Sequence, residues 1–149
     1  MLVYRITRAM YAGSLVASGG AARWNSRGKF VIYTAATRAL ACLENVVHRS
    51  GEGLQDLFRV MVIEVPEQLH QEEISLDILP ATWAEFQNYY QCQQIGDAWL
   101  QRMQTAVLRV PSAIVPNEYN YLLNPTHPDF ARVRLIQTEP FLFDPRIKQ

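Results

Sequence analysis

Alternating hydrophobic and polar positions along the chain predict a series of β-strands. Residues 2–6 and 29–34 alternate in this way. Residues 57–65 are almost continuous β-formers, so this segment predicts a central buried strand that ends at Pro66. The same patterns predict further strands at residues 74–79, 106–110, 132–137 and 141–143, with Asp144 and Pro145 marking a final turn.

One helix is expected to follow the second of these strands. Thr37 is typical of a helix N-cap, and Gly51 and Gly53 are expected to end the helix. Four residues at helical spacing form a stripe that should face the core. The stripe consists of Leu40, Leu43, Glu44 and Val47, so it places one carboxylate among apolar side chains.

Two shorter helices are predicted in the second half of the chain. Residues 82–85 have the pattern of a capping box, which predicts a helix that starts at Thr82 and runs towards Gln91. A second short helix is expected to begin at Gly96. Strands and helices are mixed without a regular βαβ period, which favours an α+β fold. At 149 residues, the chain is expected to form a single domain, residues 1–149, with a substantial core.

The charge balance disfavours nucleic acid and anionic membranes as partners. Fourteen basic residues balance fourteen acidic ones, and no basic cluster is interleaved with aromatic residues. Apolar runs are too short to span a membrane, and the N-terminus has the pattern of a strand rather than a signal peptide. Cys42 and Cys92 lie in unrelated contexts, which favours a reducing, cytoplasmic location. The three histidines lack metal-ligand spacing, so no metal site is expected.

A glycine-flanked loop at residues 19–28 carries the first candidate chemistry. It places Arg23, Trp24 and Asn25 side by side, where glycines allow a ligand to approach the backbone. The guanidinium group of Arg23 suits a phosphate group. The alternatives are a surface arginine that packs on Trp24, and a turn-forming role for Asn25.

Three separate residues could complete a site with this loop. Tyr33 could stack on a flat heterocycle or simply pack at the end of its strand. Glu44 needs a partner if it is buried, and that partner could be Arg5. Ser112 follows an apolar run and could be a turn residue. A hydrolase triad of Ser112 with His127 and Asp129 lacks a nucleophile-elbow context and is disfavoured.

Eight short motifs in this order resemble the RES family, which is named for an arginine, a glutamate and a serine. They are VYR at 3–5, ARWNSRG at 22–28, VIYTA at 31–35, LENVVH at 43–48, QIGDAWL at 94–100, VPSA at 110–113, NYLLNP at 120–125 and FDPR at 143–146. The resemblance covers nearly the whole chain. One departure is the pair Ala21–Ala22 before Arg23, where many members have two glycines.

The resemblance implies an ADP-ribosyltransferase-like α+β fold with mixed, mainly antiparallel sheets and flanking helices. It also implies a bacterial toxin of a type II toxin–antitoxin pair, with NAD+ as substrate rather than bound cofactor and an Xre-like helix-turn-helix antitoxin as partner. Site residues follow from the same resemblance. Arg23, Tyr33, Glu44 and Ser112 match the active-site positions, and Arg5, Trp24, Asn25 and Asn120 are expected to bind substrate.

The chemistry expected of such a site is cleavage of the bond between nicotinamide and ribose. This reaction passes through an oxocarbenium-like transition state, and nicotinamide leaves as a neutral molecule, so one carboxylate can suffice. Glu44 would hold the ribose 2′-hydroxyl, Arg23 and Arg5 would bind the diphosphate, and Ser112 would contact substrate or orient Glu44. Water, phosphate or a protein side chain could be the acceptor, and we expect NAD+ degradation. The alternatives are ADP-ribosylation of a protein target and a non-catalytic module that binds a nucleotide or a partner.

Overall fold

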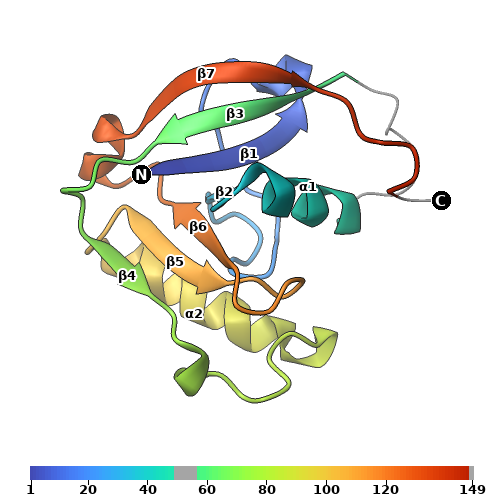
Figure 1. The fold of residues 1–149 in the computed structure, drawn as a ribbon. Coiled ribbons are helices and arrows are strands. Elements are labelled where there is room, and N and C mark those ends of the chain that lie inside the picture. The colour runs from blue at the N-terminus through green and yellow to red at the C-terminus, as the bar shows by residue number, and fades with distance from the viewer. Residues whose placement is uncertain (49–56, 148–149) are drawn as a thin grey trace.

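The strands form one mixed sheet in the part of the chain that the computed structural model describes, residues 1–48 and 57–147 (Figure 1). Seven strands of these residues lie in the order β4-β5-β6-β2-β1-β3-β7. Neighbouring strands are antiparallel except for β4 and β5, which are parallel. The strands are β1 (Leu2–Arg8), β2 (Ile32–Ala35), β3 (Phe58–Glu64), β4 (Gln71–Glu73), β5 (Val107–Pro111), β6 (Tyr119–Leu123) and β7 (Arg134–Phe141).

The sheet divides into two halves between β1 and β2. These two strands share one registered pair, Tyr4 with Ala35, whereas β1 pairs with β3 from Leu2 to Arg8. Strands β1, β3 and β7 form one half, and β4, β5, β6 and β2 form the other (Figure 1). The weak junction leaves room between the halves for polar side chains.

Each half carries one α-helix. Helix α1 (Arg38–Val47) packs on the half that contains β1 and β3, where its buried residues cluster with Ile6, Val60 and Val62. Helix α2 (Tyr89–Arg102) packs on β5 and β6, where Trp99 and Cys92 cluster with apolar residues of both strands. Short 3₁₀ helices occupy Ala9–Tyr11, Leu76–Ile78, Phe86–Asn88 and Pro128–Arg132.

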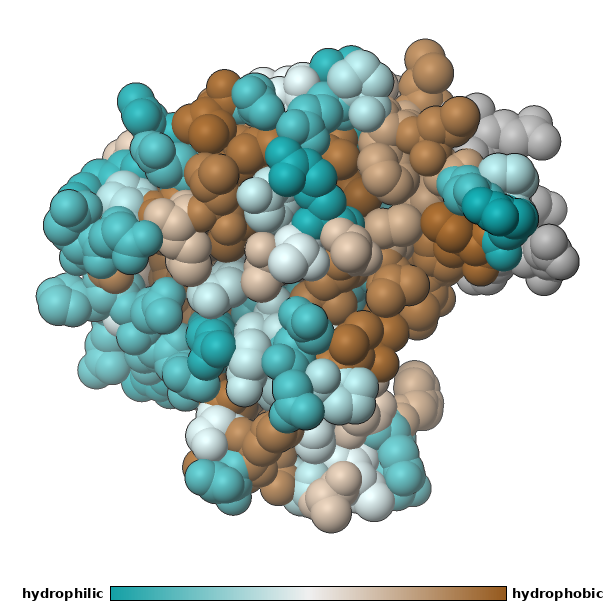
Figure 2. Space-filling model, in the orientation of Figure 1, coloured by the Kyte–Doolittle hydropathy of each residue, from teal (hydrophilic) through white to brown (hydrophobic). Residues whose placement is uncertain are grey.

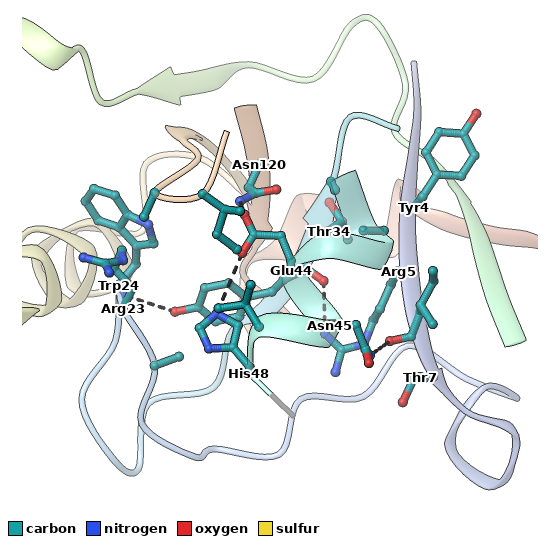
Figure 3. Close-up of a pocket in the computed structure, with 18 of the residues that line it drawn as sticks. Tyr4, Arg5, Thr7, Arg23, Trp24, Thr34, Glu44, Asn45, His48 and Asn120 are labelled. Carbon is teal, nitrogen blue, oxygen red and sulfur yellow. Dashed lines mark hydrogen bonds and ion pairs between the residues drawn. The ribbon is translucent and has the colours of Figure 1, made fainter. Parts of the chain in front are cut away.

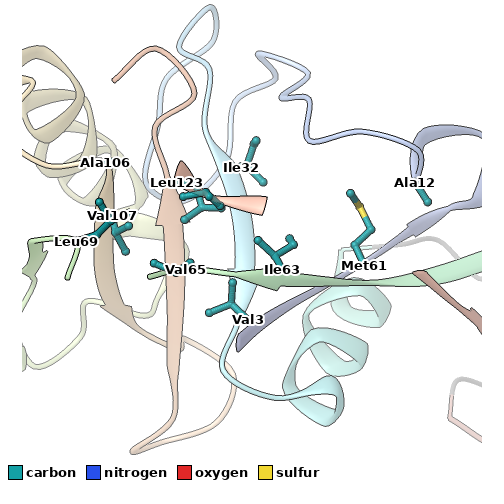
Figure 4. Close-up of a cluster of buried hydrophobic side chains, with 11 residues drawn as sticks. Val3, Ala12, Ile32, Met61, Ile63, Val65, Leu69, Ala106, Val107 and Leu123 are labelled. Atoms are coloured by element: carbon teal, nitrogen blue, oxygen red, sulfur yellow. The ribbon is translucent and has the colours of Figure 1, made fainter. Parts of the chain in front are cut away.

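A third apolar cluster joins the two halves of the sheet (Figure 4). Val3 of β1 and Ile63 of β3 pack in it together with Ile32 of β2 and Leu123 of β6. All four side chains are fully buried, and each contributes roughly 1.5–3 kcal/mol of transfer free energy. This cluster fixes the halves against each other beneath the junction of β1 and β2.

Several predicted elements are confirmed. Strands β1, β2, β3 and β5 occupy the predicted segments, and β3 is a buried strand inside the sheet, antiparallel to both of its neighbours. The two predicted closing strands form one strand, β7. The turn after Asp144 is present, since the Ile147 amide donates to the Asp144 carbonyl. The expected helix end at Gly51 and Gly53 lies outside the described residues.

Three predictions are wrong. Residues 74–79 contain a 3₁₀ helix instead of a strand, and the strand of this region is β4. The helix does not start at Thr82, because the Asn88 side chain donates to the carbonyl and hydroxyl oxygens of Thr82 and holds a turn there. Helix α2 begins at Tyr89 and runs through Gly96, so the two predicted helices are one. Strand β6 carries Asn120 and was not predicted.

The N-cap of α1 is confirmed, but its predicted core face is wrong. The Thr37 hydroxyl accepts a hydrogen bond from the Leu40 amide. The buried residues are Leu40, Ala41 and Val46, whereas Leu43 and Val47 are exposed. The face that carries Glu44 is therefore turned partly away from the core. This rotation avoids the cost of burying a carboxylate among apolar side chains.

Candidate functional site

A cavity of about 1030 Å³ opens beside the junction of β1 and β2. Its walls come from β1, the loop before β2, β2 itself and α1, together with the end of β5, part of β6 and the segment that leads into α2. Figure 3 shows side chains from these elements around one space, among them Arg5, Arg23, Glu44 and Asn120. This volume lies at the upper end of the range for small-molecule sites.

Glu44 of α1 is held by two donors from the neighbouring half of the sheet. Its Oε1 atom accepts from Ser112 Oγ at 3.0 Å and from Asn120 Nδ2 at 2.7 Å. Its Oε2 atom lies 3.7 Å from Nε2 of His48, one turn later on the helix. The carboxylate is thus fixed through one oxygen, while its second oxygen remains for a ligand.

The surroundings of Glu44 keep it ionised. Burial raises the pKa of its carboxyl group, but interactions with His48, Asn120 and Ser112 together outweigh burial, so the pKa of Glu44 lies below its ordinary value. Glu44 is therefore negatively charged at neutral pH. A charged carboxylate is the form that can stabilise a developing cation.

Ser112 reaches the site through Glu44. Its hydroxyl oxygen accepts from the amides of Ile114 and Val115, both at 3.1 Å, so its single proton is directed to Glu44. Ser112 is buried and does not line the cavity. Of the two roles predicted for Ser112, the geometry corresponds to orienting Glu44.

Asn120 lines the cavity and faces Glu44 with its amide nitrogen. Its Oδ1 atom is buried without a hydrogen-bond partner in the described part of the chain. The amide group therefore donates to the Glu44 carboxylate, while its oxygen accepts no hydrogen bond from the described residues. This arrangement orients Glu44 from the side opposite to His48 in Figure 3.

Tyr33 fixes the loop at residues 19–28 to β2. Its hydroxyl donates to Asn25 Oδ1 and accepts from the Trp24 amide at 3.1 Å. Burial raises the pKa of the Tyr33 phenol far above its ordinary range, so the phenol remains neutral. The ring lines the cavity, as required for the predicted contact with substrate.

Asn25 is buried behind the cavity and does not line it. Its Nδ2 atom donates to the carbonyl oxygens of Gly20 and Ser26 within this loop and of Lys29 directly after it. Gly28 has a φ of 86° and donates to the carbonyl of Gly19, whose φ is 77°, so both positions require glycine. Asn25 thus shapes the loop from within, as its alternative role as a turn former implies.

Helix α2 approaches the same loop very closely at Gly96. A Cβ atom at this position would lie 1.6 Å from the carbonyl oxygen of Trp24. One residue later, Asp97 accepts from both the amide and the hydroxyl of Ser26. Trp24 is buried against α2, and it also lines the cavity. The helix therefore sets the position of the loop that carries Arg23.

Arg23 is held by neutral groups, and within the described part of the chain no carboxylate pairs with its charge. It donates to the carbonyl oxygens of Trp83 at 3.3 Å and Ala84 at 3.0 Å. Its guanidinium carbon lies 5.6 Å from the ring centroid of Trp83 and 5.2 Å from that of Tyr89. A fixed cation that lines a cavity in this way can bind an anion.

Arg5 lies across the site from Arg23 in the view of Figure 3. Its Nη1 atom donates to the Tyr33 carbonyl at 3.0 Å and so links β1 to β2 where the strands diverge. Burial lowers the pKa of Arg5, since its charge is partly removed from water. In the described residues Arg5 does not pair with Glu44, whose Oε2 atom instead lies 3.7 Å from Nε2 of His48.

His48 is the functional candidate that the sequence reasoning missed. From the sequence it received no role beyond the end of the motif LENVVH and a rejected metal site, although it stands four residues after Glu44 and therefore on the same helix face. The disfavoured triad is not assembled, because Ser112 bonds to Glu44 while His127 Nδ1 accepts from the Asp129 amide.

The described residues hold no cluster of three metal-binding side chains. None of the helices described is both long and apolar enough to cross a membrane.

Comparisons with known proteins agree on one family. The family model of the RES domain matches residues 2–144. A protein named Prs ADP-ribosylating toxin from Sphingobium sp. (strain YBL2) is 38% identical over 91% of this chain and 84% of its own length. Proteins named Toxin Res from Yersinia enterocolitica and Photorhabdus laumondii are 34% and 33% identical, and each match covers 99% of this chain and 100% or 97% of the relative.

The fold has also been seen in a solved structure. The toxin–antitoxin complex MbcT–MbcA of M. tuberculosis contains a chain that matches this structure with a TM-score of 0.76, over 95% of this chain and 84% of that chain, at 18% identity. This likeness and the mixed sheet with its helices confirm the predicted α+β fold class, and they are consistent with the predicted ADP-ribosyltransferase-like fold. Together with the family match and the relatives, it leads to one conclusion: the chain belongs to the RES domain family.

Proposed function

We propose that this protein is the toxin of a type II toxin–antitoxin system and that it cleaves the nicotinamide–ribose bond of NAD+. One observation carries the proposal. Glu44 is an ionised, oriented carboxylate at a large cavity whose wall also presents two arginines without carboxylate partners in the described structure.

The chemistry follows from the charge that develops at the ribose. As the bond to nicotinamide breaks, positive charge grows on the anomeric carbon and ring oxygen, while nicotinamide departs without a proton. A general acid is therefore unnecessary. Glu44 can hold the ribose 2′-hydroxyl through Oε2 and stabilise the cation, because Oε1 is already occupied by Ser112 and Asn120.

The arginines give the site a preference for an anionic substrate. A guanidinium group has five N–H donors, and Arg5 uses one of them in its hydrogen bond to the Tyr33 carbonyl. Arg23 uses two, both with carbonyl oxygens. The donors that remain suit the oxygens of a diphosphate. Tyr33 and Trp24 supply aromatic surface for the flat rings of the substrate.

The partner is proposed to be an Xre-like antitoxin protein. Support comes from the names of the relatives, which are toxins, and from the solved complex of MbcT with its antitoxin. Leu43 and Val47 of α1 are exposed, and Figure 2 shows hydrophobic residues at the surface on the α1 side of the molecule. Exposed apolar surface next to a functional site is suited to a protein partner.

A second candidate function is ADP-ribosylation of a protein target. The name of the Sphingobium relative favours it, since that protein is described as an ADP-ribosylating toxin. Both candidates share the first step, the departure of nicotinamide, and differ in the group that accepts ADP-ribose. The same residues would therefore serve either reaction up to the point of attack.

The test is to incubate the purified, antitoxin-free protein with NAD+, with and without phosphate, and to identify the products. Nicotinamide release is expected, accompanied by ADP-ribose or its phosphorylated form. Glu44→Gln should lose most turnover and keep the fold, whereas Glu118→Gln, an exposed glutamate outside the cavity, should be fully active. Saturable NAD+ binding without any product would replace the proposal with a non-catalytic binding module.

A further inference from the structure

His48 combines three properties that the proposed reaction does not yet use. It lines the cavity, its side chain is 65% exposed, and its Nε2 atom lies 3.7 Å from Oε2 of Glu44. We propose that His48 is the acceptor-side base of this enzyme, which takes a proton from the water molecule that attacks the ribose. This inference rests on the proposed function, because it concerns the second half of the same reaction.

The geometry at Glu44 separates two tasks. Oε1 accepts the bonds from Ser112 and Asn120 that fix the carboxylate, so Oε2 is the oxygen left to contact substrate. His48 stands next to Oε2, not Oε1. The separation of 3.7 Å is too long for a direct hydrogen bond, but a water molecule can lie at about 2.8 Å from both atoms. The base is therefore placed beside the atom that holds the ribose.

Other side chains around the cavity are unsuited to this task. Among the described residues that line the cavity, His48 is the one imidazole and Glu44 the one carboxylate, and Glu44 is already engaged by Ser112 and Asn120. The hydroxyl of Tyr33 already donates to Asn25 and accepts from the Trp24 amide. The exposure of His48 also gives bulk water a route to its ring, which a hydrolytic acceptor needs.

The step balances in atoms and charge. The water oxygen forms a bond to the anomeric carbon, and the bond from that carbon to nicotinamide breaks with its electron pair on the ring nitrogen, which becomes neutral. One water proton passes to Nε2 of His48, and the hydroxyl group stays on ADP-ribose. The imidazolium that forms is stabilised by the negative charge of Glu44 and returns its proton to solvent.

The experiment measures NAD+ hydrolysis without phosphate for wild type, His48→Gln and His48→Ala. His70→Gln is the matched control, because His70 is exposed and lies outside the cavity. Loss of a general base should lower kcat by about 100-fold or more and leave KM and the dissociation constant of NAD+ unchanged. The control should match wild type. Thermal melting checks that each variant is folded.

Azide separates a base from a residue that only positions Glu44. Azide is an anionic nucleophile and carries no proton to remove, so it should restore nicotinamide release in His48→Ala and yield the glycosyl azide. It should not rescue Glu44→Gln, which lacks the charge that stabilises the cation. Wild-type hydrolysis in both His48 variants, or a loss that azide does not rescue, overturns the inference.

The acceptor itself gives one further decisive outcome. A wild-type protein that releases nicotinamide only when phosphate is present overturns the role of His48, because a phosphate oxyanion needs no base, but it upholds the proposed function. A wild-type protein that releases no nicotinamide with any acceptor removes the proposed function and this inference together. The two failures are therefore distinguishable in the same assay.

Discussion

The contact between Asn120 and Glu44 predicts a large effect of Asn120→Asp on the pH dependence of activity. The substitution replaces the donor that lies 2.7 Å from Glu44 Oε1 with an oxygen atom, so two carboxylates share one site. Like charges about 4 Å apart repel by about 4 kcal/mol at an effective dielectric constant of 20. Loss of the hydrogen bond to a charged group adds roughly 1.5–3 kcal/mol.

These magnitudes fix the direction and size of the shift. One carboxyl of the pair must hold a proton at a pH where wild-type Glu44 is ionised, so the acid limb of the kcat profile moves to higher pH. About 4 kcal/mol corresponds to roughly three pKa units, and partial exposure reduces this to about one or two. Asn120→Ala removes the donor without adding a charge, so its acid limb should move by less than that of Asn120→Asp.

Stability supplies an independent check on the same contact. A carboxyl whose folded-state pKa is raised contributes stability that is present below its unfolded pKa and is lost as pH rises through the folded value. The melting temperature of Asn120→Asp should therefore be lower than that of wild type at pH 7, and the two melting temperatures should approach each other near pH 4. Identical acid limbs in wild type and a folded Asn120→Asp would refute the reasoning, because the contact would then not control Glu44.

Three further predictions concern the groups that hold the site together. Ser112→Ala removes one donor to Glu44. We expect kcat for nicotinamide release to fall about tenfold with little change in KM, because the lost hydrogen bond raises the activation free energy by about 1–2 kcal/mol. Tyr33→Phe keeps the ring but frees the loop from β2, so KM should rise and the melting temperature should fall, whereas an unchanged KM would show that the hydroxyl does not hold the loop. Gly96→Ala places a Cβ atom 1.6 Å from the Trp24 carbonyl oxygen, so chemical denaturation should show a free energy of unfolding that is lower by about 1–3 kcal/mol. A variant as stable as wild type would contradict this packing.

Local patterns predicted the elements that carry the site more reliably than the contacts within it. Thr37 predicted the start of α1, and with it the position of Glu44 on a helix. This prediction succeeded because an N-cap hydrogen bond joins residues only three positions apart, here Thr37 and Leu40. The partners of Glu44 could not be predicted from spacing, since Ser112 and Asn120 lie 68 and 76 residues away along the chain. These side chains come together because β5, β6 and β2 pair in the sheet, and the hydrophobic pattern of the chain did not predict β6 as a strand.

Gly96 shows why one boundary was misplaced. Glycine in a helix costs roughly 0.5–1 kcal/mol relative to alanine, so local propensity favours a helix boundary at Gly96, where the second helix was expected to begin. The structure keeps the helix continuous because the loop carbonyl of Trp24 occupies the space where a side chain would lie. The residue serves the packing of α2 against the site, and that packing becomes visible only when both segments are placed.

The junction of β1 and β2 explains how the site keeps two opposite charges available. If Arg5 and Glu44 formed a direct pair, each would neutralise the other, and neither charge would be available to the proposed substrate, which has both anionic and cationic parts. The fold instead directs Arg5 to the Tyr33 carbonyl, and satisfies Glu44 with a hydroxyl and an amide. Neutral partners orient the charges without cancelling them. The weak pairing of two strands is thus what makes a charged, preorganised site possible in this sheet.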